Sequence, residues 1–423
     1  MEAVGMTTEV QPTAREIDIL DPALYDDPWE TYRWLRNEAP LYRDEGNDLW
    51  VASTHEDVSH VSRHDKLYSA AQGVRPRIAA PMSIISMDDP EHTRQRRIVS
   101  KGFTPRKVRE LTQHMRDITN EVLDEIQGKG EIDFVSDFAI HVPLIVLAEL
   151  MGLDPGMRLQ LQEWSDAMMA GDNHIDPDDP VLNRSAEAFG AFADHVIGLI
   201  EERRKNPTDD LIGILTGAFD AGALEHEWEG PSGDTPIRED LADDELLMFL
   251  VLLLVAGNET TRNAITGGLL YFSRFPEEQQ KLIEHPELID LAVEEIVRMT
   301  SPVLSFHRTV TEDHTYKGVD FKVGDRILML YQSANRDERV FDEPDRFRVD
   351  RDPNPHLGFG VGTHYCFGAN LARAEIKVVY DELFKRLRDI RVPDPDAALH
   401  RMRSTLVLGI ETLPAVFTPV GAV

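Results

Sequence analysis

Residues 359–368 read Phe-Gly-Val-Gly-Thr-His-Tyr-Cys-Phe-Gly, which sets the single cysteine of the chain, Cys366, in a glycine-rich loop. An apolar segment with helical spacing, residues 369–387, follows directly. At a helix start, unpaired backbone N–H groups and the helix dipole stabilise a thiolate, and glycines let the backbone approach whatever the sulfur binds. The stretch therefore predicts a thiolate that acts as a nucleophile or as a ligand.

The neighbours of Cys366 favour the ligand. A nucleophilic cysteine needs a positioned histidine base, and His364, two residues away on a tight loop, is poorly placed to turn back on the sulfur. A small buried apolar cysteine is the ordinary alternative, and the four flanking glycines and the histidine count against it. A nucleotide loop is not supported, because Thr363 and Tyr365 stand where the GxGxxG spacing would place its third glycine.

The loop resembles the haem-ligand signature of the cytochrome P-450 family, which it matches at Phe359, Gly360, Gly362, His364, Cys366 and Gly368. The resemblance implies the cytochrome P-450 fold, a mainly α protein with small β-sheets (α+β). It implies haem b, iron protoporphyrin IX, with Cys366 as the axial iron ligand and with Phe359, Gly360 and His364 among the haem-binding residues. The implied activity is that of a monooxygenase that uses O2 and electrons drawn indirectly from NAD(P)H.

The composition excludes several other classes. The 44 Lys and Arg residues stand against 76 Asp and Glu, and a net charge of −32 argues against a nucleic-acid binder. Hydrophobic residues make up 42% of the 423 residues, enough for a large core, and a single cysteine suits a reducing cytosol. The longest apolar run, Leu246–Gly257, is shorter than the ~20 residues of a membrane helix. Residues 1–16 lack the pattern of a secretory signal, so we expect a cytoplasmic protein.

The spacing of apolar residues predicts one mostly helical domain over residues 17–423, preceded by a disordered tail at 1–16. The spacing is helical through most of 91–224, and residues 226–240 have the composition of an exposed loop. The strands expected near the two ends of the chain are too few for separate cores, so we expect them to share a sheet. The expected elements outside the helical block are a helix at 21–38 and strands at 41–43, 49–53, 308–310, 319–321 and 326–331.

Glu259 and Thr260 place an acid and a hydroxyl directly after the apolar run. Buried polarity is costly without a purpose, and a threonine that bonds the carbonyl of Ala256 loosens the helix and makes room for a small ligand or water. In the ordinary alternative, Thr260 is merely back-bonded and Glu259 lies at the helix surface. The family resemblance implies that Glu259 and Thr260 are catalytic and relay protons to the bound O2.

Two further helical motifs carry charge. Glu295 and Arg298 are three residues apart and can pair on one helix face; the resemblance implies a structural ion-pair network that they form with Arg346. His92 and Arg96 are four apart and share a face after a turn at 88–90. The resemblance implies that they bind the haem propionates, with Arg308 and His364 as further partners, whereas a solvated helix face is the ordinary alternative.

Residues 94–109 hold seven basic side chains and no acid, against the charge of the whole chain. Local positive charge implies an acidic partner, although an ordinary charged surface helix is an alternative. The resemblance implies a ferredoxin or flavoprotein that supplies electrons to a monomeric enzyme from outside. The docking residues expected are Arg94, Arg97, Lys101, Arg106, Lys107 and Arg109.

The resemblance also suggests an apolar substrate pocket, and the segments 333–337 and 354–360 look like bacterial members that oxidise sterols, terpenoids or branched lipids. The candidate lining residues are Ile84, Met168, Leu252, Val255, Ala256, Val303, Leu304 and Val407. Two rival functions differ in class. A haem-thiolate sensor would bind without turnover, and a haem-free cysteine hydrolase would need His364 or His356 within hydrogen-bond reach of Cys366.

Overall fold

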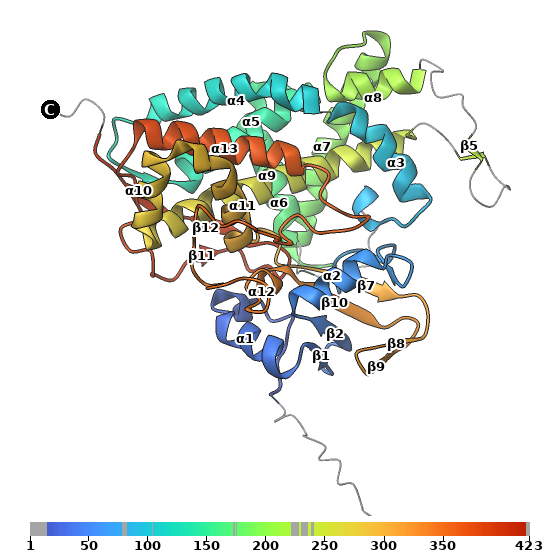
Figure 1. The fold of residues 1–423 in the computed structure, drawn as a ribbon. Helices are drawn as coiled ribbons and strands as arrows, with labels where there is room; N and C mark the ends of the chain where they lie inside the picture. Colours follow the sequence, from blue (N-terminus) through green and yellow to red (C-terminus); the bar gives the residue numbers. More distant parts are fainter. Residues whose placement is uncertain are drawn as a thin grey trace, which may run out of the picture.

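The principal sheet joins the two ends of the chain, as the sequence predicts. In this computed structural model its strands run in the order β1 (Leu41–Asp44), β2 (Leu49–Ala52), β10 (Arg326–Leu330), β7 (Ser305–Val310) and β3 (Tyr68–Ser69). β1 and β2 form an antiparallel hairpin, and β2 pairs in parallel with β10, nearly 280 residues further on. In Figure 1 this sheet occupies the lower part of the molecule, below most of the helices.

The structure describes residues 15–77, 83–103, 105–171, 174, 176–220, 228–229, 236–237 and 241–419. Residues 1–14 of the expected tail at 1–16 and most of the loop at 226–240 therefore lie outside the described residues, whereas Arg15 is described and contacts Glu30. The other described strands are short: β4 (Glu131–Asp133), β5 (Trp228–Glu229), β6 (Pro236–Ile237), β8 (His314–Tyr316), β9 (Val319–Phe321), β11 (His400–Arg401), β12 (Ile410–Thr412) and β13 (Pro414–Val416).

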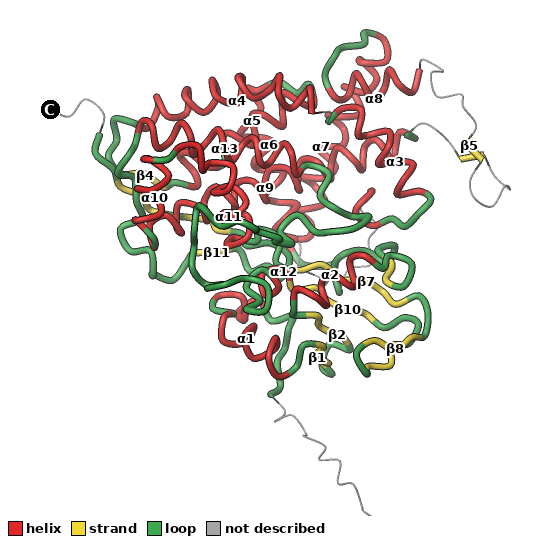
Figure 2. The backbone as a smooth tube through the Cα atoms, viewed as in Figure 1, coloured by secondary structure: helices red, strands yellow, loops and turns green. Residues whose placement is uncertain are grey.

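Helices make up the larger part of the described chain (Figure 2). The α-helices are α1 (Trp29–Glu38), α2 (His55–Arg63), α3 (Glu91–Val99), α4 (Pro105–Ile126), α5 (His141–Met151), α6 (Arg158–Ala170), α7 (Pro180–Lys205), α8 (Leu211–Asp220), α9 (Asp243–Arg274), α10 (Pro276–Glu284), α11 (Ile289–Thr300), α12 (Tyr331–Ala334) and α13 (Ala369–Arg386). Shorter turns are η1 (Pro22–Asp26), η2 (Ser83–Ser86), η3 (Ser100–Gly102), η4 (Val135–Ala139), η5 (Pro155–Met157) and η7 (Pro286–Leu288). None of the described helices combines the length and apolarity that a membrane crossing requires.

The long helix α9 positions the site. Its first turn holds Asp243, Asp244 and Glu245, which complement the positive end of the helix dipole. It packs against α5, α11 and α13. The approach of α13 is close, because a Cβ added at Gly268 would lie 2.3 Å from the Tyr380 hydroxyl oxygen. A rigid contact of this kind fixes α9 relative to the segment that carries Cys366.

Two expected helices are divided in the structure. The helix expected at 21–38 consists of η1 and α1, with Pro28 at the start of α1. The basic segment 94–109 is split between α3, η3 and α4 rather than lying on one helix. In η3, Gly102 packs so close to Leu211 that an added Cβ would lie 2.1 Å from its side chain.

Candidate active site

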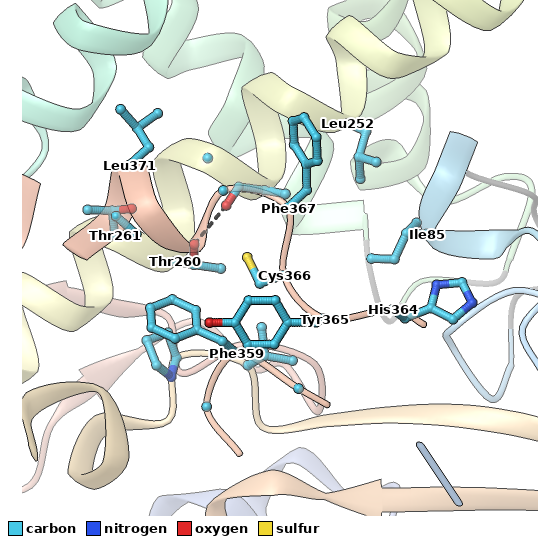
Figure 3. Close-up of a pocket in the computed structure, with 18 of the residues that line it drawn as sticks. Ile85, Leu252, Thr260, Thr261, Phe359, His364, Tyr365, Cys366, Phe367 and Leu371 are labelled. Atoms are coloured by element: carbon cyan, nitrogen blue, oxygen red, sulfur yellow. Dashed lines mark hydrogen bonds between the residues drawn. The ribbon is translucent and has the colours of Figure 1, made fainter. Parts of the chain in front are cut away.

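A cavity lies between α9 and the loop that carries Cys366, and its walls come from distant parts of the chain (Figure 3). α9 contributes one face, with Leu252, Ala256, Thr260 and Thr261 at helical spacing. The opposite face is the 358–368 loop, and the start of α13 closes one end. Figure 3 shows the Cys366 sulfur and the Thr260 side chain directed into the same space. The structure thus brings together the loop and helix motifs that the sequence singled out.

The loop conformation depends on its glycines. Gly360 and Gly362 have φ values of +68° and +80°, which glycine adopts without strain. An added Cβ at Gly362 would lie 2.6 Å from the carbonyl oxygen of Ser62. The Cys366 amide donates a hydrogen bond to the Phe359 carbonyl at 2.8 Å, which closes the loop into a tight hairpin. Only glycine at these positions lets the loop turn so tightly against α2.

The protein alone does not hold Cys366 as a thiolate. Burial raises the pKa of the thiol, and this outweighs the hydrogen bonds from the amides of Gly368 and Ala369 and the attraction of Arg96. Burial thus opposes the effect of the helix start, which by itself favours the thiolate. A metal cation at the sulfur would reverse the balance.

Neither candidate histidine serves Cys366 as a base. The imidazole of His356 bonds Glu294 at 2.9 Å and the amide of Gly358 at 3.1 Å. Burial lowers the pKa of His364 to about 3, so it is neutral, and its ring lies 4.3 Å from that of His92. No hydrogen bond joins either histidine to the sulfur among the described residues. The arrangement that a cysteine hydrolase requires is not formed.

Polar donors line part of the cavity, and its two arginines lack an anionic partner among the described residues. Arg308 is 4% exposed and, within the described part of the chain, hydrogen-bonds only the His307 carbonyl, at 2.9 Å. The half-buried Arg96 bonds the Tyr365 carbonyl at 2.7 Å. Neither arginine has an ion pair among the described residues. The buried Nδ1 of His92 has no hydrogen-bond partner among the described residues and lies 3.9 Å from a carboxylate oxygen of Asp89. Buried guanidinium groups are costly without a counter-charge, so this wall is built for a ligand that carries carboxylates.

These observations fit the haem that the sequence predicts. The buried sulfur faces the cavity, much of the lining is apolar, and the two arginines Arg96 and Arg308, together with the neutral imidazoles of His92 and His364, suit the two propionates of iron protoporphyrin IX. Phe359 and Gly360 also line the cavity, as expected. The donor set therefore matches the cofactor in both its apolar and its acidic parts.

Thr260 and Glu259 lie on different sides of α9. The Thr260 hydroxyl donates to the Ala256 carbonyl at 2.7 Å and faces the cavity. Glu259 is 1% exposed and pairs with Arg262 at 2.6 Å, and Arg262 also reaches Asp166 of α6 at 3.1 Å. The alternative that left Glu259 at the helix surface is wrong. Burial raises its pKa to about 7 against the attraction of Arg262, and the charge of Asp166 raises it further.

The ion-pair network forms, but with a different second arginine. Arg298 bonds both Glu295 oxygens, at 2.7 and 2.8 Å, and Arg351 contacts both at 3.1 Å. Arg346, the predicted member, has a side chain that is 45% exposed and lies 3.5 Å from Glu277; it takes part only through its carbonyl. The reason is local, since Phe347 turns into the core and leaves the preceding side chain facing solvent.

Half of the predicted pocket residues line the cavity, namely Ile84, Leu252, Ala256 and Val303. The other four do not. Val255 and Val407 belong to a separate small cluster with Met169, against which Met168 packs. Leu304 is fully buried in the main core. Val255 is displaced because it lies on the face of α9 turned toward α6, one residue before the cavity-facing Ala256.

The predicted docking residues also divide. The prediction that Arg94 contacts the redox partner is wrong. Its side chain is buried and bound to Glu91 and Glu245, so it cannot contact another protein. Arg97, Arg106 and Arg109 are exposed, and Arg106 pairs with Glu110 at 2.7 Å. The side chains of Lys101 and Lys107 lie outside the described residues. Burial of Arg94 follows from its position on the α3 face that packs against the start of α9.

Several site residues were missed by sequence reasoning. Arg262 and Asp166 surround Glu259, and Thr261 and Glu375 line the cavity beside Thr260. Arg262 had a local signal, its spacing of three from Glu259. Glu375 had a weaker one, an acid within the apolar helix that follows Cys366. Asp166 had none, because its contact depends on how α6 crosses α9.

The family described as Cytochrome P450 matches residues 26–410, and the chain belongs to it. A steroid C26-monooxygenase of Mycolicibacterium smegmatis is 34% identical over 96% of this chain and 97% of its own length. A second, from Mycobacterium tuberculosis, is 35% identical over 96% of this chain and 98% of its own length. These are relatives of the chain across nearly its whole length.

Solved structures of the same family are similar to this chain over nearly its whole length. The cytochrome P450 PksS of the Bacillus subtilis bacillaene polyketide synthase has a TM-score of 0.82 and 32% identity, covering 95% of this chain and all of its own. CYP109E1 from Bacillus megaterium, in complex with corticosterone, has a TM-score of 0.80 and 31% identity, covering 93% and 99%. The chain is accordingly a haem-thiolate monooxygenase that acts on a hydrophobic small molecule. It uses haem b, O2 and NAD(P)H-derived electrons delivered by a redox partner.

Proposed function

We propose that this monooxygenase hydroxylates a steroid or a similar branched lipid. The observation that carries the proposal is the apolar wall of the cavity that holds Cys366, which includes Leu252, Ala256, Val303 and Phe306. Such a wall orients a rigid hydrocarbon by shape and offers it few polar contacts. The two relatives described as steroid C26-monooxygenases support the steroid class. So does the corticosterone complex of a similar structure.

We assign the residues as follows. Cys366 holds the iron through its sulfur, and His92, Arg96, Arg308 and His364 bind the propionates. When bound, the haem supplies the activation of O2 and the transfer of one oxygen atom to a C–H bond. The chain positions the substrate against the apolar wall and excludes water from it. Glu295, Arg298 and Arg351 keep the loop before Cys366 in place.

Proton delivery is the chemical task of Thr260 and Glu259. The Thr260 hydroxyl holds its proton on the Ala256 carbonyl and faces the cavity, so a small rotation redirects that proton inward. Glu259, whose pKa burial raises to about 7, exchanges protons near neutral pH. Its neighbour Asp166 has a side chain that is 43% exposed, which connects this acid to solvent.

The redox partner docks, in our proposal, on the face around Arg97, Arg106 and Arg109, which are exposed in an otherwise acidic chain. An acidic ferredoxin or flavoprotein fits that charge. Reversal of Arg106 and Arg109 to Glu should slow the first electron transfer from a ferredoxin and weaken its salt dependence. Reduction by dithionite should not change.

We further infer a cytoplasmic monomer in which residues 17–423 form one domain.

The first experiment is the visible spectrum of the purified protein, reduced with dithionite and exposed to carbon monoxide. The wild type should show the red-shifted Soret band of a thiolate-ligated haem, and Cys366→Ser should lose it. Absence of that band after reconstitution with haem would overturn the assignment of Cys366.

The substrate is tested separately. A sterol ketone with a full side chain should displace water from the site, seen as a blue shift of the Soret band, and should be hydroxylated with a ferredoxin, its reductase and NADH. Testosterone, which lacks the side chain, is the matched control for oxidation at the side-chain end. Spectral binding without any product would instead support a sensor.

A further inference from the structure

Arg373 of α13 and Glu294 of α11 form an ion pair for which the proposed mechanism has no use. The Arg373 guanidinium donates from Nε to Glu294 Oε1 at 2.6 Å and from Nη2 to Oε2 at 2.8 Å. Two parallel hydrogen bonds of this kind fix the plane of the guanidinium group. The hydrogen bond to Glu294 raises the pKa of Arg373, so the arginine stays a cation at every working pH.

His356 hydrogen-bonds the same carboxylate. The amide of Gly358 donates to His356 Nδ1 at 3.1 Å, so Nε2 carries the imidazole proton and donates it to Glu294 at 2.9 Å. Partial burial acts to raise the pKa of Glu294, but the hydrogen bonds from Arg373 and His356 prevail and lower it to about 2. The pair therefore consists of one fixed cation and one fixed anion beside a neutral imidazole.

The cation of this pair lies against the segment that carries the sulfur. Arg373 Nη1 donates to the Tyr365 hydroxyl oxygen at 2.9 Å, and Arg373 Cζ lies 4.3 Å from the centre of the Phe359 ring, in a cation–π contact. Tyr365 precedes Cys366 directly, and the Phe359 carbonyl accepts a hydrogen bond from the Cys366 amide. In Figure 3 both rings lie beside Cys366.

Arg373 is also the cation that remains free to act on the sulfur. Arg96 attracts a Cys366 thiolate as well, but in our assignment the haem propionates neutralise Arg96. Arg373 is not among the described residues that line the cavity, so no propionate takes up its charge. Glu294 lies further from the sulfur in the chain of contacts. Its hydrogen bonds go to Arg373 and His356, and none joins it to the loop of Cys366 in the described part of the chain.

A charge near a redox centre shifts its reduction potential in a direction set by the sign of the charge. Reduction of the iron adds one electron, which the redox partner supplies. A nearby cation therefore stabilises the reduced form and raises the potential, and a nearby anion lowers it. Salt screens partly buried charges of this kind much less than exposed ones.

We propose that Arg373 and Glu294 are positioning residues that set the reduction potential of the iron held by Cys366. Arg373, which contacts the loop, raises the potential. Glu294 fixes Arg373 in place and offsets part of its charge. This inference rests on the proposed role of Cys366.

Variants that remove one charge at a time test the sign. The readout is the reduction potential of the substrate-free holoenzyme, from a spectroelectrochemical titration of its Soret band. Arg373→Gln should lower the equilibrium constant for reduction about tenfold, which is ~59 mV for one electron. Glu294→Gln should raise it by a smaller factor, and the double variant should lie between the two. Shifts of the same sign in both single variants, or no shift in either, would overturn the proposal.

Two controls separate charge from structure. Arg373→Lys keeps the cation and loses the two parallel hydrogen bonds, so its equilibrium constant should stay within about threefold of wild type. Arg116→Gln removes an arginine whose side chain is 30% exposed, like that of Arg373, and that pairs with Asp381. Asp381 lies about 12 Å further along α13 than Arg373, so this variant should leave the potential unchanged. A decrease in Arg373→Lys as large as in Arg373→Gln would reject the electrostatic role.

The carbon monoxide spectrum of each variant keeps this inference apart from the proposed function. The thiolate band should be normal in all of them, because none of the substitutions removes the sulfur. With a normal band, unshifted potentials refute the role of the ion pair alone. A wild type that lacks the band refutes the assignment of Cys366.

Discussion

Glu295 of α11 and Glu259 of α9 are both fully buried, and each pairs with an arginine three residues further along its own helix. Their surroundings differ in one respect. Glu295 has a second arginine, Arg351, whereas the single arginine of Glu259 is shared with another acid, Asp166. Two arginines thus neutralise the charge of Glu295, whereas Glu259 has only a share of one arginine.

The consequence is opposite in sign for the two pKa values. Burial acts to raise the pKa of Glu295, but the hydrogen bonds and charges of Arg298 and Arg351 prevail and leave it lowered. For Glu259 burial prevails and the pKa rises to about 7. The comparison teaches that a second cation converts a proton-exchanging acid into a permanent anion. An acid that must exchange protons near neutral pH therefore needs fewer cationic neighbours than a structural one.

The largest expected effect is on the Glu295 network. Glu295→Ala leaves two buried arginines without an anion and should lower the free energy of unfolding by about 3–5 kcal/mol. Urea denaturation of the holoenzyme measures it. Arg351→Ala should be similarly harmful, whereas Arg346→Ala, at an exposed side chain, should stay within about 0.5 kcal/mol of wild type. A larger loss for Arg346 than for Arg351 would restore the original sequence prediction.

Glu259→Gln should act on turnover rather than on stability. Removal of a general acid slows the proton-dependent step about 100-fold, at the low end of such effects. The side chain remains isosteric and Arg262 keeps Asp166, so at pH 5, where Glu259 is protonated, the urea midpoint should change little. Product formation under saturating substrate measures the first effect. A variant that turns over normally would show that Glu259 is structural, like Glu295.

The fold was predictable from sequence where the pattern was local or strongly periodic. The strands at 41–44, 49–52 and 326–330 and the helix after Cys366 follow from apolar spacing and glycines, and their shared sheet follows from the shortage of strands at either end. The site was predictable where motifs touch the ligand, as at Cys366 and Thr260. The α+β fold class is confirmed, and so is the shared sheet for the strands near 41, 49, 308 and 326. The expectation that the strand at 319–321 belongs to that sheet is wrong, because it pairs with its chain neighbour β8 in a separate two-stranded sheet.

What could not be predicted depends on side-chain direction across tertiary contacts. The choice between Arg346 and Arg351 depends on whether Phe347 faces the core, and both arginines follow similar residues in the sequence. Arg94 and Arg97 are equally basic, yet one faces α9 and is buried. Asp166 meets Arg262 across 96 residues, which no local pattern encodes. Burial, rather than residue type, decided each of these cases.

The pH dependence of stability should differ in sign between the two acids. The folded pKa of Glu259 is about 7 and a free glutamate has about 4.3, so between these values the folded state binds more protons than the unfolded state. The contribution of Glu259 to stability therefore falls as pH rises from about 4.3 to 7. Glu295, with a lowered pKa, contributes stability that is lost on acidification.

Urea midpoints at pH 5 and pH 8 test this difference. The excess stability of wild type over Glu259→Gln should be larger at pH 5 than at pH 8. A third urea midpoint at pH 3 tests Glu295: the excess over Glu295→Gln should be smaller at pH 3 than at pH 5, because stability from a lowered pKa is lost only below the unfolded value of about 4.3. Parallel pH profiles for the two variants would contradict the distinction between the two sites.

The smallest expected effect comes from Asp166, which acts on Glu259 from α6. The negative charge of Asp166 raises the pKa of Glu259. Asp166 also accepts a hydrogen bond from the Arg262 guanidinium, which Glu259 shares. Asp166→Asn removes the charge and keeps the amide oxygen as an acceptor for Arg262, so the pKa of Glu259 should fall by less than about one unit. The pH profile of turnover should then move to lower pH by the same amount, with a nearly unchanged maximum. In the double variant with Glu259→Gln this displacement should vanish, because the group that titrates is gone. A shift that survives in the double variant would place the titrating group elsewhere and would remove Glu259 from the proton route.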